Sequence, residues 1–283
     1  KEDSMKREIL NINGKNISIA VWDDTENAKG VVQLSHGMAE HIQRYDDFAR
    51  FLCGNGYIVI GDDHRGHGYT DPDKLGVASG DIFEDTVADL RYITSYASKT
   101  YGLPVILMGH SYGSFLTQRY LTYGFDGIKA AILCGSAKQG GLILKVGKSL
   151  SRKKCKNEAD EPGATFAKMT FEKYDNDFGE GKNSWLSLSK ENVQKFNADP
   201  LCGFTCSNGF YYSFFTGIDE TTVTALPYNL AFLCKYGSCF NILDKSAIAF
   251  FVSLFSNSNI AIHQGNFGET FFIGNISKAR IIQ

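Results

Sequence analysis

Short apolar runs alternate with helical stretches through the first half of this chain of 283 residues. The runs that read as buried strands are residues 30–37, 56–63, 104–110 and 129–134. Apolar residues recur at helical spacing between them, most clearly over 81–102, where a glycine ends the pattern. Strands that alternate with helices at this spacing build a mostly parallel sheet with helices on both faces. The sequence therefore predicts an α/β fold.

Two further features refine this prediction. Near the start, an Asn13-Gly14 pair lies between two alternating runs, which is typical of a β-hairpin. After residue 137 the alternation stops, and residues 138–215 are polar and charged with separate amphipathic segments. We therefore predict a first core part at 1–137, a helical insertion at 138–215 and a second core part at 216–283.

The composition excludes several classes of protein. The net charge is −2 and the isoelectric point is near 6.3, so we expect no nucleic-acid partner. Seven cysteines form no C-x-x-C pair, which argues against a disulfide framework or a zinc site and for a reducing compartment. The charged start shows no signal peptide, and the most apolar run, 247–255, is about half the ~20 residues of a membrane span. We expect a soluble, cytoplasmic protein.

The stretch "PVILMGHSYGSF" indicates a reactive serine. Ser111 is the centre of a G-x-S-x-G pattern that follows a predicted strand and opens a predicted helix. A serine at such a bend sits on a sharp turn, and the N–H groups of the following helix face any anion formed there. The pattern alone is also compatible with an ordinary strand-to-helix turn. The strand before it and the helix after it favour Ser111 as a nucleophile.

The segment "LSHGMAEH" supplies a second part of such a site. Acyl transfer needs two backbone N–H groups to hold the oxyanion, one after the nucleophile and one from a loop after an earlier strand. Tyr112 follows Ser111, and Met38 lies in the loop that follows the strand at 30–37. We therefore predict the N–H groups of Met38 and Tyr112 as the oxyanion hole. A plain turn with a surface histidine is the alternative.

The cluster "DDHRGHG" resembles a metal site because it holds two aspartates and two histidines. Arg65 lies in its middle, and the sequence offers no other ligand cluster to complete it. We predict that Asp62, Asp63, His64 and His67 pack the loops below the site. The sequence therefore predicts neither a metal nor a cofactor.

The base and the acid follow by elimination. In α/β folds with a G-x-S-x-G serine, the acid and then the histidine come later in the chain. Five of the six histidines precede Ser111, which leaves His263. Asp219, Glu220 and Asp244 are the candidates for the acid, and the layout of elements favours Asp244.

Five motifs together resemble the monoglyceride lipase and lysophospholipase branch of the α/β-hydrolase fold, also called serine aminopeptidase-like. They are "HGMAEH", "DHRGHG", "GHSYGSF", "WLSLSKENVQKF" and "DPLCGF", in the family's order and spacing, and they cover residues 1 to about 218. The resemblance implies that residues near 138–215 form a helical cap over an acyl pocket. It also implies that Ser111 is the nucleophile, that His36 and His41 shape the oxyanion loop, and that His110 is not the base.

The last 60 residues depart from that family. Only six of the 60 charged residues lie in 221–283, the expected Asp-Pro is missing, and no arginine precedes His263. A tail read from a shifted frame is one explanation, and it would leave Ser111 without a base. The sequence thus predicts a cofactor-free serine hydrolase of esters such as monoacylglycerols or lysophospholipids, with transient membrane contact through the cap. The alternative is a catalytically inactive relative with a defective acid and histidine region.

Overall fold

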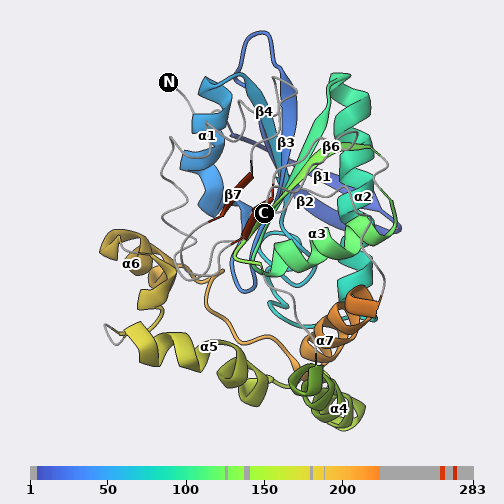
Figure 1. Cartoon of the computed structure of the whole chain (residues 1–283), viewed down its shortest axis with the longest axis vertical. Coiled ribbons are helices and arrows are strands. Elements are labelled where there is room, and N and C mark those ends of the chain that lie inside the picture. Colours follow the sequence, from blue (N-terminus) through green and yellow to red (C-terminus); the bar gives the residue numbers. More distant parts are fainter. Residues whose placement is uncertain are drawn as a thin grey trace.

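A six-stranded sheet forms the centre of the protein in the computed structural model (Figure 1). The structure describes residues 5–124, 127–136, 141–178, 181–187, 189–223, 262–264 and 270–272. The strands are β1 (Met5–Ile12), β2 (Lys15–Trp22), β3 (Gly30–Ser35), β4 (Tyr57–Asp62), β5 (Val105–His110) and β6 (Ile128–Cys134). Their order in the sheet is β1-β2-β4-β3-β5-β6. β3 pairs in parallel with β4 and β5, and β5 with β6, which confirms the mostly parallel sheet.

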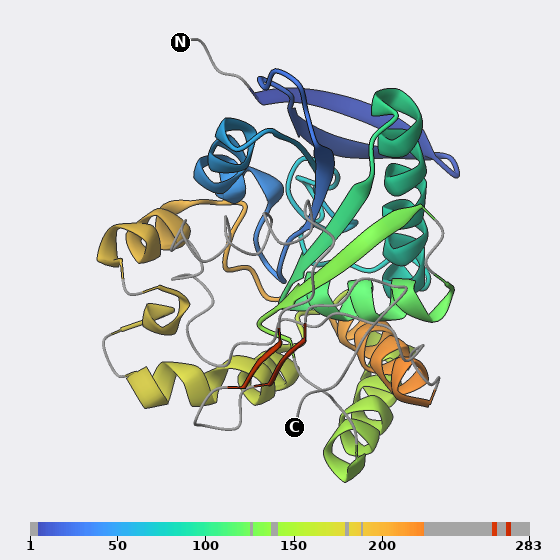
Figure 2. The same ribbon diagram turned by 45° about the horizontal axis from the view of Figure 1, so that its top comes forward.

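The first two strands form the predicted hairpin at the edge of the sheet (Figure 2). Asn13 and Gly14 both have positive φ angles, 51° and 80°. Two successive residues of this kind make the tight turn whose twist matches that of the flanking strands. β2 then pairs antiparallel with β4, so the hairpin extends the parallel part of the sheet.

Helices cover both faces of the sheet, as the strand alternation requires. α1 (Asp46–Gly54) packs on one face, and α2 (Ile82–Tyr101) and α3 (Tyr112–Thr122) pack on the other. β5 shows the cause, because successive side chains of a strand point to opposite faces. Val105 and Leu107 join the core with α2 and α3, whereas Ile106 and Met108 join the core with α1.

The helix predicted at 81–102 is α2, and its ends are those the sequence indicates. Asp81 caps the start and accepts a hydrogen bond from the Glu84 N–H. Gly102 ends the helix in the left-handed conformation, with a φ of 63°. On the inner side of α2, the buried Asp89 carboxylate pairs with both arms of Arg65 at 2.6 and 2.9 Å. This pair holds the loop after β4 against the helix.

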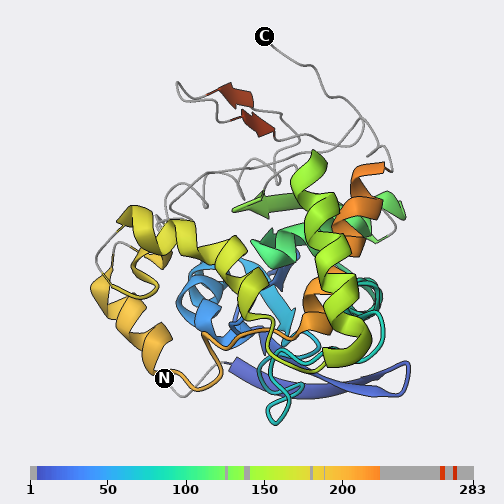
Figure 3. The same cartoon turned by 90° about the horizontal axis from the view of Figure 1, so that it is seen from below.

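The predicted insertion is helical (Figure 3). It comprises α4 (Gly141–Glu158), α5 (Ala164–Phe178), the 3₁₀ turn η2 (Ser184–Leu186) and α6 (Lys190–Ala198). The next helix, α7 (Asn208–Val223), packs against α2, α3 and α4. The expected boundary at residue 215 lies inside α7. The division of the chain into core and cap stays a prediction.

The described part of the tail is one short hairpin. β7 (Ile262–Gln264) pairs antiparallel with β8 (Thr270–Phe272), in a two-stranded sheet of its own. Among the described residues, no helix combines the length and the apolar character that crossing a membrane requires.

Two helical glycines on the interior surfaces of α4 and α7 provide a test of this packing. A Cβ at Gly217 would lie 2.0 Å from the Phe83 ring on α2, whereas a Cβ at Gly147 would meet only ordinary contacts from 3.4 Å outward. Alanine at Gly217 therefore forces the two helices apart, and we expect it to lower the free energy of unfolding by about 1–3 kcal/mol. Alanine at Gly147 improves helix propensity, so it should raise the free energy of unfolding by up to about 1 kcal/mol. Urea unfolding of both variants measures the difference, and equal effects would contradict the close α2–α7 contact.

Candidate active site

Ser111 forms a sharp, strained turn between β5 and α3. Its φ of 51° and ψ of −114° are unusual for a residue with a side chain. Backbone bonds hold the turn in place: the Ser111 N–H donates to the Cys134 carbonyl at 2.8 Å, and the Ser111 carbonyl accepts from the Ser114 N–H at 2.9 Å. Such strain persists only where the surrounding structure imposes it, and it is concentrated at functional sites. The predicted strand–turn–helix context of the serine is confirmed.

The two glycines of the G-x-S-x-G pattern have no room for a side chain. A Cβ at Gly109 would lie 2.3 Å from the Gly113 carbonyl oxygen. A Cβ at Gly113 would lie 2.1 Å from the Ser35 carbonyl oxygen, which belongs to the end of β3. The start of α3 therefore rests directly on the backbone that leads into the loop after β3. This contact brings the sequence around Met38 to the same edge of the sheet as Ser111.

The two predicted oxyanion donors belong to these adjoining segments. Tyr112 is the first residue of α3, so its N–H has no acceptor within the helix. The N-terminal end of a helix carries a partial positive charge that favours a negative ligand. Met38 lies in the loop directly after β3. The arrangement offers a place where two N–H groups and the positive end of α3 could face an anion beside Ser111.

Buried side chains fix the conformation of the loop around Met38. The Gly37 N–H donates to Glu40 Oε1 at 2.6 Å, and the Ala39 N–H donates to His67 Nε2 at 3.1 Å. Ala39 has a φ of 56°, a conformation that needs such support. Both neighbours of Met38 are therefore held by buried side chains, one from the same loop and one from the loop after β4.

Glu40 is the centre of a polar network that sequence reasoning did not identify. Its Oε1 accepts a hydrogen bond from the Tyr45 hydroxyl at 2.9 Å, lies 3.3 Å from His110 Nδ1, and its other oxygen pairs with Arg44. Burial alone would raise the pKa of Glu40, but the Arg44 charge and the bond from His110 outweigh burial and lower the pKa to about 2. The carboxylate is thus charged at neutral pH and can hold the Gly37 N–H. The only signal in the sequence is that Glu40, in the motif "HGMAEH", precedes Arg44 by four positions.

His110 belongs to this network. Its Nδ1 lies 3.0 Å from the Tyr45 hydroxyl as well as near Glu40. The structure therefore places this ring beside the loop that follows β3, and that His110 is not the base stays a prediction.

The "DDHRGHG" cluster lies below the loop, where its side chains bond to one another and to the loop. His64 Nδ1 lies 2.7 Å from Asp62 Oδ2, and the backbone N–H of His64 donates to His36 Nε2 at 3.0 Å. The rings of His36 and His64 stack with centroids 3.9 Å apart. Burial lowers the pKa of His36 and lowers that of His67 to about 4, so both are neutral and can accept hydrogen bonds at pH 7. The predicted packing role of the cluster is confirmed.

Asp63 ties the loop to the edge hairpin. It accepts a hydrogen bond from the Ile42 N–H at 2.9 Å and pairs with Arg7 on β1 at 2.8 Å. Its side chain is completely buried, so it depends on these partners.

The base and the acid remain predictions. Asp244 lies outside the described residues, and for His263 the structure describes only the backbone, in β7. The two other candidate acids are engaged on α7: Asp219 pairs with Lys148 at 2.8 Å and Glu220 with Arg119 at 3.0 Å.

His67 makes the stability of this site depend on pH. The unfolded histidine, with a pKa near 6.5, takes up a proton between about pH 6.5 and 4, whereas the buried ring, with a pKa of about 4, does not. The free energy of unfolding should therefore fall as pH drops through this range, by up to about 3 kcal/mol. In a His67→Gln variant, the amide oxygen can still accept the hydrogen bond from the Ala39 N–H. The free energy of unfolding should then change less steeply with pH. Urea unfolding across this range measures it, and an unchanged slope would assign the effect to other groups.

Comparisons with known proteins bear on the family of the chain. Residues 26–264 match the family described as serine aminopeptidase, S33. Monoglyceride lipase of Homo sapiens is 29% identical over 202 residues, which is 68% of this chain and 59% of that protein. Monoglyceride lipase of Mus musculus is 26% identical over 249 residues, which is 84% of this chain and 74% of that protein. The family match thus continues beyond residue 218, where the sequence motifs end.

Solved structures agree on the fold. A thermostable carboxyl esterase from Bacillus coagulans, in complex with glycerol, has a TM-score of 0.76 at 20% identity, over 90% of this chain and 99% of that chain. A soluble variant of monoglyceride lipase from Saccharomyces cerevisiae, bound to a substrate analog, has a TM-score of 0.62 at 17% identity. The match covers 83% of this chain and 77% of that chain. The chain therefore belongs to the serine aminopeptidase S33 family and is a monoglyceride lipase-like α/β-hydrolase.

Proposed function

We propose that the protein is a serine hydrolase that cleaves carboxylic esters through an acyl-enzyme, with Ser111 as the nucleophile. The observation that carries the proposal is the strained turn at Ser111, with a φ of 51°, between β5 and the N-terminal end of α3. A hydroxyl on such a turn is exposed at the edge of the sheet, where a substrate carbonyl can reach it.

The mechanism begins with attack of the Ser111 hydroxyl oxygen on the ester carbonyl carbon. The carbonyl oxygen becomes an oxyanion, which the N–H groups of Met38 and Tyr112 stabilise. Each such donor is typically worth about a hundred- to a thousand-fold in rate. The bonds from Gly37 to Glu40 and from Ala39 to His67 support this role, since they fix the peptide groups on both sides of Met38.

A serine hydroxyl needs a base to remove its proton, and we assign this role to His263 with Asp244 as its orienting acid. The histidine takes the proton on attack and returns it to the leaving alcohol. Water then repeats the sequence on the acyl-enzyme and releases the fatty acid. The ion pairs of Asp219 and Glu220 with cap and core cations favour Asp244 over these two alternatives.

The substrates we propose are long-chain esters such as monoacylglycerols or lysophospholipids. The relatives named monoglyceride lipase support this class. An apolar setting around the nucleophile suits such substrates: the ring centroids of the buried Phe210 and Phe214 of α7 lie 5.2 and 5.4 Å from that of Tyr112, the residue after Ser111.

The surface of α4 suits a substrate that arrives from a lipid layer. Leu142 and Ile143 are 78% and 79% exposed, and Val146 and Leu150 share their side of the helix, within an arc of about 100°. The opposite side of α4 packs on α7. A helix with an exposed apolar side and many lysines and arginines binds the interface of anionic membranes. We therefore include transient contact of α4 with a membrane surface in the proposal.

Labelling with a tagged fluorophosphonate tests the nucleophile and the base together. We expect the parent protein to be labelled and the Ser111→Ala variant to lose both labelling and hydrolysis of a monoacylglycerol, the latter by roughly 10⁴-fold or more. His263→Ala should also lose labelling, because the hydroxyl is then not activated. Labelling that survives in the His263 variant would contradict His263 as the base. An unlabelled but folded parent would instead establish the inactive relative.

Flotation with anionic vesicles tests the membrane contact of α4. Replacing Leu142 and Ile143 with serine removes the two most exposed apolar side chains of the helix, and we expect vesicle binding to fall by about ten-fold or more. Ile9→Ser is the matched control, since Ile9 is 57% exposed on β1, outside the cap. Equal loss in both variants would show that α4 is not the contact surface.

A further inference from the structure

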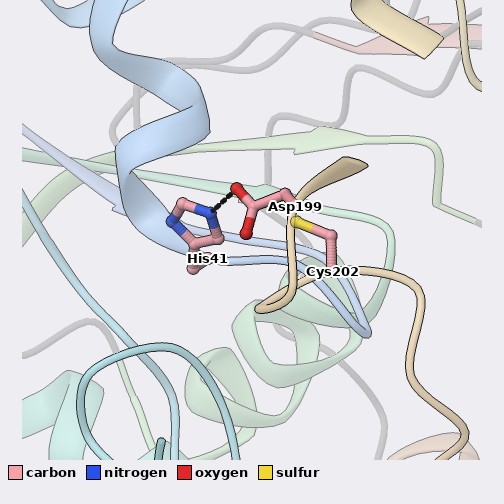
Figure 4. A group of neighbouring side chains, drawn as sticks. All are labelled: His41, Asp199 and Cys202. Atoms are coloured by element: carbon pink, nitrogen blue, oxygen red, sulfur yellow. Dashed lines mark hydrogen bonds and ion pairs between the residues drawn. The ribbon is translucent and has the colours of Figure 1, made fainter. Parts of the chain in front are cut away.

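A second group of functional side chains lies where the loop after β3 meets the segment that follows α6. It consists of His41, Asp199 and Cys202 (Figure 4). His41 Nε2 lies 2.9 Å from Asp199 Oδ2, and one ligand atom from each of the three residues lies within 4.8 Å of the others. The histidine precedes the other two residues by more than 150 positions, so no spacing in the sequence reveals the group. The sequence predicts no metal site, and the structure brings these three potential ligands together.

The three side chains offer the ligand atoms that zinc prefers. Imidazole nitrogen, carboxylate oxygen and cysteine sulfur bind Zn²⁺ at about 2.0–2.3 Å in tetrahedral geometry, which puts the ligand atoms about 3.3–3.7 Å apart. The His41–Asp199 pair is about half an ångström tighter than this, and the other separations are at most about one ångström looser. Small side-chain rotations close that difference, because Asp199 and Cys202 share one turn, in which the Cys202 N–H donates to the Asp199 carbonyl at 3.0 Å.

The hydrogen bonds around the cluster leave these ligand atoms available. The His41 side chain is nearly buried, and among the described residues its Nδ1 has no hydrogen-bond partner. To bind a metal through Nε2, the ring must carry its proton on Nδ1. Within the described residues, this change costs only the hydrogen bond between His41 and Asp199. Asp199 Oδ1 accepts the Leu201 N–H at 2.8 Å, which orients the carboxylate as a supporting hydrogen bond does in metal sites.

A divalent cation would bind the deprotonated forms of these side chains. Thiolate, not thiol, is the ligand form of cysteine, so binding would displace the Cys202 proton and the affinity for the cation would rise with pH. Arg44, which lies in the same part of the loop, pairs with Glu40.

We propose that His41, Asp199 and Cys202 bind one zinc-class divalent cation, with water in the fourth position. The cation would join the segment after α6 to the loop that carries Met38. One backbone bond already joins these segments, from the Gly203 N–H to the Ala39 carbonyl at 2.9 Å. The site is independent of the proposed ester hydrolysis and can be tested without any substrate.

Titration of the full chain with Co²⁺ tests the site directly. We expect one equivalent to give the near-ultraviolet charge-transfer absorption of a cobalt–thiolate bond, and Zn²⁺ to displace it. Binding should release protons and tighten as pH rises. Loss of an outer hydrogen bond typically costs a metal site about 10–100-fold, so loss of a direct ligand in Cys202→Ser or Asp199→Asn should weaken binding by roughly 100-fold or more.

Cys155→Ser is the matched control, because Cys155 is a free cysteine on α4 outside the cluster. It should keep the absorption, and Zn²⁺ should raise the melting temperature of this variant and of the parent but not of Cys202→Ser. Absence of the absorption in the parent, or an equal signal in Cys202→Ser, would overturn the proposal. The cluster would then be a simple His41–Asp199 hydrogen bond between two segments.

Discussion

The contact between the start of α3 and the end of β3 is the constraint on which the rest of the site depends. A Cβ at Gly113 would lie 2.1 Å from the Ser35 carbonyl oxygen, so the helix and the strand touch backbone to backbone. This contact holds the first turn of α3, which follows the strained turn at Ser111, against the backbone that leads into the loop after β3. A single methyl group at this position would separate the two halves of the proposed oxyanion hole.

Buried polar groups, together with the packing of Met38 on the core, hold the loop that completes this arrangement. Glu40, kept charged by Arg44, accepts the Gly37 N–H, and neutral His67 accepts the Ala39 N–H. The two groups respond differently to burial. The carboxylate stays charged because Arg44 and His110 outweigh the effect of burial on its pKa, whereas burial itself keeps the imidazole neutral. With pKa values of about 2 and about 4, both groups hold these protonation states at neutral pH.

The sequence predicts the fold well because its signals are local. The Asn13-Gly14 turn, the Gly102 cap and the period of α2 are each determined by neighbouring residues, and all were correctly predicted. The G-x-S-x-G turn is local for the same reason. Contacts between distant segments leave no such signal: Glu40 with His110 and His41 with Asp199 depend on how the loop after β3 meets β5 and the cap. These partners could be found only from the structure.

The loop after β3 connects the active-site turn to the cap, and this gives the two proposals a common physical basis. Its glycine N–H is held by Glu40 of the same loop, and its alanine N–H by His67 of the loop after β4. The segment after α6 also holds it, through the bond from the Gly203 N–H to the Ala39 carbonyl and through the pair of Asp199 with His41. A shift of the segment after α6 therefore acts on the same peptide groups that flank Met38. Whatever binds His41, Asp199 and Cys202 would fix the cap segment and the oxyanion loop as one unit, because the ligands come from both.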